Sequence, residues 1–277
     1  ILADNLWRGK FENINNIKNI NFNIDKQFYD LDLNIYENCL KVTKNIDHVI
    51  HLADVVAGIN YVFKNEFSLF QLNLNINSNI LKSSIVNKVK KITYVGTACS
   101  YPLEKQSSLN IIPLKEEDAY PANPESAYGW SKLIGEYEIG LASKYGLINS
   151  SILRLHNVYG PPSELSEKLS QVIPALCRKL ILNEDYIVWG SGKQRRSFVY
   201  IDDVVDALIN SMKIEHGHEV VQIGPRESIS IEDIAIKLLK LSKKNVKPIF
   251  DTTKAEGDFD RVPDISKAER ILNWKPK

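Results

Sequence analysis

Two side chains at a spacing of four residues could take part in one proton transfer. Tyr128 and Lys132 belong to the segment Tyr128-Gly-Trp-Ser-Lys132, and this spacing places both on one face of a helix. A phenol has a pKa of about 10, so a base that works near neutral pH needs a pKa lower by roughly 3 units, or about 4 kcal/mol. A neighbouring ammonium group lowers a phenol pKa. The pair is also common on surface helices, so its meaning depends on the motifs around it.

Three further motifs accompany this pair in a fixed order. An apolar stretch ends in Thr97-Ala-Cys99-Ser-Tyr-Pro, and the later motifs are Arg154-Leu-His-Asn157-Val-Tyr-Gly-Pro and Gly192-Lys-Gln-Arg-Arg196-Ser-Phe. Together they resemble the extended short-chain dehydrogenases/reductases, the family of NAD-dependent nucleotide-sugar epimerases and dehydratases. The resemblance covers nearly the whole chain, from Asp4 to Ala268.

The resemblance implies a catalytic role for four residues. Tyr128 would remove a proton from a sugar hydroxyl, Lys132 would hold the nicotinamide ribose and lower the tyrosine pKa, and Thr97 would hydrogen-bond the reacting oxygen. Cys99 resembles the cysteine acid/base of GDP-mannose 3,5-epimerase and GDP-fucose synthase, and a thiol suits removal of a proton beside a ketone.

The resemblance also implies residues that bind NAD and the substrate. Asp4, followed by Asn5, matches the acidic residue on the adenosine ribose, which favours NAD over NADP. The other implied cofactor contacts are Asp30 and Leu31 at the adenine, Leu52 and Ala53 near the pyrophosphate, and Tyr128 and Lys132 at the nicotinamide ribose. The implied nucleotide-sugar contacts are Asn157, Arg196, Arg261 and Lys168.

Residues near Cys99 narrow the reaction without deciding it. Ala98-Cys99 stands where a 4,6-dehydratase of the family has Asp-Glu, which disfavours dehydration. We therefore expect an NAD-dependent nucleotide-sugar epimerase that acts through a transient 4-keto sugar, with 3,5-epimerisation of a GDP-sugar as the leading reaction. Lys168 and His156 are the candidates for a second acid/base. Gln171 stands where GDP-fucose synthase has its histidine, which argues against GDP-fucose synthase activity.

Two alternatives remain open from the sequence. The first is a C4 epimerase or C4 dehydrogenase of a UDP- or GDP-sugar, in which Cys99 only packs. The second is a non-catalytic NAD-binding regulatory or interaction protein on the same fold. The catalytic set Thr97, Tyr128 and Lys132 is intact, which weighs against the second alternative.

Composition excludes several other functions. The 277 residues carry 35 basic and 34 acidic side chains, a net charge of +1, so no basic field favours nucleic acid. The sequence shows neither a membrane span nor a signal peptide, and we predict a cytoplasmic protein. Its three cysteines lack a Cys-x-x-Cys spacing and do not support a zinc site.

Apolar segments alternate with amphipathic ones, which predicts an α/β fold with a doubly wound parallel sheet. We place an NAD-binding Rossmann domain at 1–158 and a smaller, mainly substrate-binding domain at 159–277, with some of its segments returning to the sheet.

The helix predicted at 124–145 is expected to start with Asn123 as its cap and Pro124 in its first turn. The helices at 68–87 and 124–145 match those that form the dimer interface of relatives, so we expect a homodimer. The predicted strands are 28–31, 48–52, 91–96, 150–155, 186–188 and 220–223, and the other predicted helices are 36–43, 169–182, 201–212 and 231–242.

The sequence departs from the family pattern at its beginning. Family members start with a strand and a Gly-x-x-Gly-x-x-Gly turn that holds the cofactor pyrophosphate, and this sequence contains no such turn. We expect a chain that starts at the second strand of a longer protein, leaves the centre of the sheet unpaired, and alone binds NAD weakly.

Overall fold

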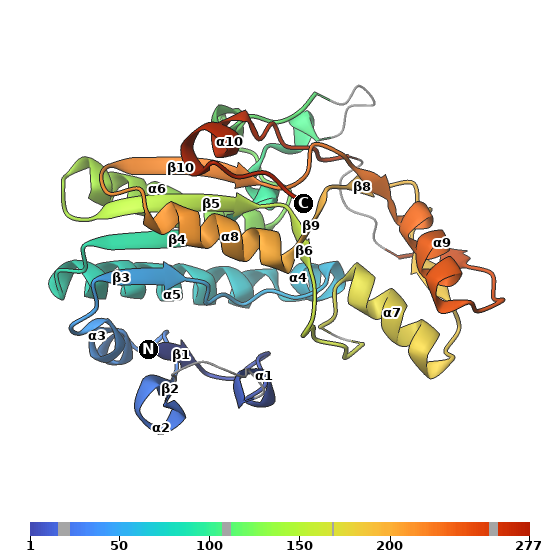
Figure 1. The fold of residues 1–277 in the computed structure, drawn as a ribbon, viewed down its shortest axis with the longest axis horizontal. Coiled ribbons are helices and arrows are strands. Elements are labelled where there is room, and N and C mark those ends of the chain that lie inside the picture. Colours follow the sequence, from blue (N-terminus) through green and yellow to red (C-terminus); the bar gives the residue numbers. More distant parts are fainter. Residues whose placement is uncertain (16–22, 107–111, 168, 255–259) are drawn as a thin grey trace.

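A parallel sheet in the order β10-β5-β4-β3 forms the centre of the protein (Figure 1). The computed structural model describes residues 1–15, 23–106, 112–167, 169–254 and 260–277. The four strands are β3 (His48–His51), β4 (Lys91–Thr97), β5 (Asn149–Leu155) and β10 (His218–Ile223). Because every pair is parallel, their carboxyl ends meet at one edge of the sheet.

Both faces of this sheet are covered by helices, as the alternating sequence pattern predicts. Ile152 of β5 belongs to one buried cluster and the next residue, Leu153, to another, since successive side chains of a strand point to opposite faces. The first cluster lies under α3 (Tyr36–Thr43), α5 (Glu66–Val86) and α6 (Ala127–Lys144). The second lies under α8 (Ile201–Met212) and α10 (Ser266–Leu272).

A smaller group of elements extends beyond the carboxyl ends of the strands (Figure 1). Its apolar cluster joins α7 (Val172–Leu182) and α9 (Ile231–Ser242) to the pair β7 (Ile187–Trp189) and β12 (Ile249–Asp251). Two more short pairs connect it to the sheet: β6 (Asn157–Tyr159) with β9 (Phe198–Tyr200), and β8 (Arg195–Arg196) with β11 (Ile229–Ser230). The return of β10 to the main sheet agrees with the sequence expectation, while the boundary between 158 and 159 stays a prediction.

The N-terminal strands form a separate sheet. Within the described residues β1 (Leu2–Asp4) pairs only with β2 (Phe28–Asp30), and β3 pairs only with β4. The pair β1-β2 is thus not joined to the main sheet among the described residues, and Ile50 and Leu52 of the β3 segment are exposed. The short helices nearby are α1 (Glu12–Asn15), α2 (Ile24–Gln27) and α4 (Ile59–Lys64).

Several element boundaries differ from those predicted. The expected cap of the long helix was wrong: α6 begins at Ala127, and the Ser126 hydroxyl caps it by accepting from the Gly129 amide at 3.2 Å. Pro124 instead lies in an isolated bridge with Pro102, and a residue held extended cannot begin a helix. Helix α7 begins at Val172, three residues later than predicted. The predicted strands 28–31 and 186–188 correspond to the three-residue strands β2 and β7. The sequence missed β6, β8, β9, β11 and β12 and the 3-10 helices η1 (Ala98–Ser100), η2 (Leu103–Lys105) and η3 (Glu116–Ala119).

Among the described residues, no helix has the length and apolar character that crossing a membrane requires.

A buried ion pair fastens α6 to the sheet. Glu136 Oε2 accepts from Nε and Nη2 of Arg154, a β5 residue, at 2.9 and 2.8 Å, and both side chains are almost fully buried. The guanidinium also donates to the Tyr101 hydroxyl and to the Glu116 carbonyl. Such a pair is costly to break, because the remaining charge stays buried without its partner.

We therefore expect Glu136→Gln to lower the free energy of unfolding by about 3–5 kcal/mol. Urea denaturation followed by circular dichroism measures this change. Glu269→Gln is the matched control, because Glu269 pairs with Arg226 on the surface and exposed pairs contribute about 1 kcal/mol or less. Equal effects of the two substitutions would contradict the anchoring role of Glu136.

Candidate active site

The structure brings together the four residues predicted to be catalytic. Thr97 ends β4 and its hydroxyl accepts from the Cys99 amide at 3.2 Å, which begins the short turn η1. Tyr128 lies in the first turn of α6, beside the Thr97 hydroxyl, which is a hydrogen-bonding partner of its phenol. Lys132 follows one turn later and is almost fully buried. The site thus lies at the carboxyl edge of the sheet, where open α/β sheets bind ligands.

A glycine allows α6 to approach the Cys99 turn. An added Cβ at Gly129 would lie 2.2 Å from the Cys99 carbonyl oxygen and 2.9 Å from Pro124 Cβ. Neither neighbour can move away easily, because one is backbone and the other is a proline ring. Gly129 therefore fixes the distance between the helix that carries Tyr128 and the turn that carries Thr97 and Cys99.

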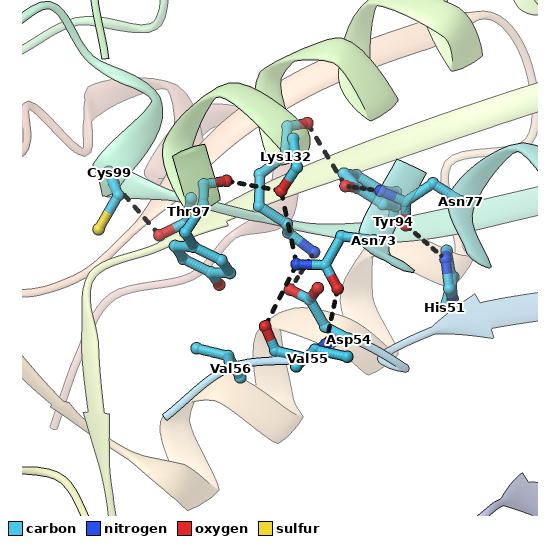
Figure 2. Close-up of polar contacts among 12 residues, drawn as sticks. His51, Asp54, Val55, Val56, Asn73, Asn77, Tyr94, Thr97, Cys99 and Lys132 are labelled. Carbon is cyan, nitrogen blue, oxygen red and sulfur yellow. Dashed lines mark hydrogen bonds and ion pairs between the residues drawn. The ribbon is translucent and has the colours of Figure 1, made fainter. Parts of the chain in front are cut away.

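Asp54 is a member of this site that the sequence reasoning missed. Its Oδ2 lies 3.2 Å from Lys132 Nζ, and the two side chains are only 6% and 2% exposed. Figure 2 shows Asp54 in the segment after β3, beneath Lys132. The one signal in the sequence was a charged residue in an otherwise apolar stretch, Leu52-Ala-Asp-Val-Val-Ala57.

The charge around Tyr128 differs from the expectation. Burial, and next the Asp54 carboxylate, raise the pKa of Tyr128 well above its ordinary value, while the Thr97 hydroxyl acts in the opposite direction. Lys132, which was expected to lower this pKa, is paired with Asp54. Burial also raises the pKa of Asp54, against the opposing effect of Lys132.

Buried amides hold the segment around Asp54 in place. Asn73 of α5 accepts from the Val55 amide at 2.7 Å and donates to the Val55 carbonyl at 3.2 Å (Figure 2). Asn77, one turn further, bonds His51 and the Tyr94 hydroxyl. Burial and then the Lys132 ammonium lower the pKa of His51 to about 3, so this histidine is neutral near pH 7. The Lys132 ammonium also stacks over the Tyr94 ring at 4.3 Å.

Cys99 has a cationic neighbour. Arg261 Nη1 lies 3.2 Å from Cys99 Sγ, and the arginine is buried, although these residues are 162 positions apart. The sequence placed Arg261 at the substrate diphosphate; the structure places its guanidinium at the thiol. The thiol thus has a positively charged hydrogen-bond donor as its neighbour.

The residues predicted to bind adenosine lie together at the ends of β1 and β2. Asp4 and Asp30 are register partners, and the Leu31 amide donates to the Asp4 carbonyl at 3.2 Å. Asp4 Oδ1 accepts from the Leu6 amide at 2.7 Å, and Asn5 Oδ1 accepts from the Trp7 amide at 3.1 Å.

These residues fit a dinucleotide at its two ends. An added Cβ at Gly9 would lie 3.2 Å from Asp4 Oδ2, so the missing side chain leaves room at this oxygen for a ribose hydroxyl. Tyr128 and Lys132 are the donors expected at the other ribose. Between the ends, Leu52 is exposed and Ala53 packs against the core, and the sequence offers no glycine-rich turn for the pyrophosphate.

The residues predicted to bind the substrate lie on separate elements. Asn157 begins β6, where its backbone N–H donates a hydrogen bond to the Ser197 carbonyl at 3.0 Å. Arg196 lies in β8. Lys168 falls outside the described residues, and Gln171 precedes the first turn of α7. His156 is buried and bonds Gln222, and burial lowers its pKa to about 3.

Comparison with known proteins shows the family of this chain. Residues 6–224 match the family model described as the NAD dependent epimerase/dehydratase family. The chain belongs to the NAD-dependent epimerase/dehydratase family. It is 34% identical to GDP-mannose 3,5-epimerase of Arabidopsis thaliana over 90% of this chain, and it spans only 66% of the length of that relative.

Two further relatives match a larger share of their own length. A putative UDP-glucose 4-epimerase of Methanocaldococcus jannaschii is 31% identical over 100% of this chain and 85% of its own. The structure of UDP-glucose 4-epimerase from Thermotoga maritima with UDP-glucose superposes with a TM-score of 0.85 at 25% identity, covering 99% of this chain and 84% of that one. The predicted Rossmann-type α/β fold of this family is confirmed.

Gly129→Ala is expected to move α6 away from the Cys99 turn and to lower both stability and any activity. The reason is the 2.2 Å approach to the Cys99 carbonyl oxygen. Gly140→Ala is the matched control on the same helix, because its Cβ would meet only the His218 ring at 3.4 Å; it should be neutral or stabilise by up to about 1 kcal/mol. Thermal unfolding of both variants measures the difference, and equal melting temperatures would contradict the tight contact.

Proposed function

We propose that the protein is an NAD-dependent nucleotide-sugar epimerase that acts through a transient 4-keto sugar. Its leading reaction is 3,5-epimerisation of a GDP-sugar, with residues 1–158 holding the cofactor and 159–277 mainly the substrate. Supporting this proposal are the Thr97–Tyr128–Lys132 set, the family membership and the contact between Arg261 and Cys99.

Bound NAD would supply the acceptor and later the donor of the C4 hydride. Asp4 and Lys132 would hold its two ribose groups, and Asp30 and Leu31 would contact its adenine. Tyr128 would take the proton of the C4 hydroxyl, and Thr97 would orient the same oxygen by a hydrogen bond. Asn157 and Arg196 would bind the nucleotide sugar, since a guanidinium matches the geometry of a phosphate.

The contact between Cys99 and Arg261 is the observation that favours 3,5-epimerisation. A ketone at C4 acidifies the protons at C3 and C5, and their removal requires a base. Cys99, whose thiol contacts the Arg261 guanidinium, would be the group that acts as this base. Cys99 would remove or return the carbon-bound proton on one face of the ring, and a second acid/base must act on the other face.

One observation favours the alternative of a C4 epimerase or dehydrogenase. His156, a candidate for the second acid/base, is buried against Gln222, and its pKa is lowered to about 3. Epimerisation at C4 needs no base beyond Tyr128, because the 4-keto sugar only has to rotate in the site and then accept the hydride on its other face. The likeness to 4-epimerases agrees with this second candidate.

Exchange with D2O separates the two reactions. The protein is incubated with excess NAD and a panel of GDP- and UDP-sugars, and deuterium in the recovered sugars is located by NMR. We expect deuterium at C3 or C5, because Cys99 would exchange its proton with solvent. Inversion at C4, or a 4-ketone without deuterium at its neighbours, would support the alternative.

Two variants serve as controls for this experiment. Cys99→Ala should abolish exchange at C3 and C5 while C4 oxidation continues. Tyr128→Phe should lower every reaction by about 10²–10⁴-fold and retain the cofactor. An unchanged rate in Tyr128→Phe would contradict the enzymatic role and favour a cofactor-binding regulatory protein.

We further propose that the protein is a homodimer through α5 and α6. These helices pack against each other, and α6 exposes apolar side chains at Trp130, Ile134, Tyr137 and Leu141. Their spacing of three and four residues places them on one face of the helix. A second copy of the same face would bury this stripe.

Tyr137→Glu should convert the dimer to a monomer, because it places a charge in the centre of the apolar stripe. Sedimentation equilibrium measures the mass. Leu241→Glu is the control, since Leu241 is an exposed apolar residue of α9 and should leave the dimer intact. A wild-type protein that is monomeric at micromolar concentration would overturn this interface.

A further inference from the structure

The smaller group of elements brings the ends of two helices together at one end of the molecule. Helix α7 is followed by β7 and helix α9 by β12; the helices pack in one apolar cluster and the strands pair in parallel (Figure 1). Both helices therefore end on the same side of this group. The Lys244 ammonium, which donates to the Asn183 amide oxygen, joins the two connections. We call residues 181–185 and 236–249 the helix-end surface.

Aliphatic side chains protrude from the helix-end surface. Leu241, at the end of α9, is 74% exposed, and Ile181, at the end of α7, is 69% exposed. Three more lie with about half of their surface in solvent: Leu182, Val246 and Ile249. Large aliphatic side chains that gather on one exposed surface indicate an interaction site.

The same surface carries a local positive charge, although the whole chain is close to neutral. Residues 236–249 contain five lysines and no acidic residue. Asp185, at the end of α7, is an exposed carboxylate on this surface, so positive charges outnumber negative ones. Four of the lysines are exposed and form no ion pair with a described residue: Lys237, Lys240, Lys243 and Lys247.

Local stabilisation of the fold explains only part of this charge. Glu184, the other carboxylate at this end, is already bound to Arg178. A helix C-terminus favours cations within its last turn, and α9 ends at Ser242. This effect accounts for Lys240 but not for Lys237 or Lys247.

The helix-end surface matches the headgroup region of an anionic lipid bilayer. Aliphatic side chains enter the boundary between headgroups and acyl chains, and anionic lipids attract lysines. Because a lysine stem is long and apolar, its ammonium group reaches the headgroups while neighbours such as Leu241 are inserted. A single-stranded nucleic acid would instead need aromatic rings on which its bases stack, and the protruding side chains here are aliphatic.

We propose that the helix-end surface binds anionic membranes reversibly. Leu241 and Ile181 insert at the headgroup boundary, and the exposed lysines contact lipid phosphates. The contact is peripheral, since no helix among the described residues could cross a membrane. The surface lies apart from Tyr128 and Lys132, so this inference goes beyond the proposed function and does not depend on it.

Sedimentation with vesicles tests the inference. The protein is mixed with sucrose-loaded vesicles of phosphatidylcholine, either alone or with one third phosphatidylserine, and the bound fraction is measured after centrifugation. We expect binding only to vesicles that contain phosphatidylserine. Raising the salt concentration from about 0.1 M to 1 M should weaken it tenfold or more, because the Debye length falls from about 10 Å to 3 Å. Equal binding to both kinds of vesicle, or binding to neither, would overturn the inference.

A double variant locates the charge that matters. Lys240→Gln combined with Lys247→Gln should weaken vesicle binding about 25-fold, because each lysine near an anionic surface contributes about fivefold. Lys88→Gln combined with Lys213→Gln is the matched control: it removes the same net charge before β4 and after α8, at the amino edge of the main sheet. Equal losses in the two double variants would show that net charge alone is responsible, against a contact through the helix-end surface.

A second variant tests insertion of the aliphatic side chains. Leu241→Gln should weaken vesicle binding about tenfold, because a buried leucine is replaced by a polar side chain of similar size. Leu147→Gln is its control, since Leu147 is 54% exposed but lies before β5, at the amino edge of the sheet. Thermal unfolding should be the same for all of these variants, because each substituted side chain is exposed. Unchanged binding in Leu241→Gln would exclude insertion and overturn the inference.

An acidic protein segment is the other occupant that lysines could attract. Polyglutamate is therefore added in a parallel titration. Binding of polyglutamate that the Lys240→Gln and Lys247→Gln pair weakens, without binding to any vesicle, would replace the membrane by an acidic protein partner. Turnover of nucleotide sugars is measured for every variant and should equal that of the wild type. If the wild type converts no nucleotide sugar, the proposed function fails, and the vesicle experiment still decides the membrane contact.

Discussion

The close packing of α6 on β4 and β5 is the constraint on which the site depends. Gly129 allows contact with the Cys99 turn at one end of the helix, and the Glu136–Arg154 ion pair holds the helix two turns later. Tyr128 directly precedes Gly129 and Lys132 lies between the two anchors, so the positions of both follow from the helix geometry once the anchors are set. The apolar face of α6 packs against the sheet, while Gly129 and the Glu136–Arg154 ion pair determine how closely the helix approaches it.

This packing also determines the electrostatics of the site. Lys132 and Asp54 are both withdrawn from water, so each charge depends on the other for compensation. Low solvent access strengthens the effect of every neighbouring charge on the Tyr128 phenol. Arg261 reaches the cysteine from a distant part of the chain, so the thiol and the phenol have separate charged partners, one cationic and one anionic. The two side chains therefore have different electrostatic surroundings within one site.

The sequence predicted those parts of the molecule that local patterns determine. The i, i+4 spacing of Tyr128 and Lys132 and the apolar strand that ends at Thr97 are local features, and the structure brings these three residues together as they predict. Asp54 and the Arg261–Cys99 contact depend on the tertiary fold, because they join segments 78 and 162 residues apart, and no spacing rule connects them. The start of α6 was misjudged because Asn123 and Pro124 carry a valid cap signal, which the extended pairing of Pro124 with Pro102 overrides. Strands of two or three residues, such as β8 and β11, have too few side chains to show a period.

The pairing of β10 with β5 has a consequence for the order in which the protein folds. The strand that covers this side of β5 begins 63 residues after β5 ends, and the helix α10 that packs over it comes later still. During synthesis the early βα units therefore leave the ribosome while one edge of their sheet lacks its neighbour, and non-local pairings of this kind form slowly. The length of this interval depends on the rate at which residues 156–223 are translated, because β10 ends at Ile223.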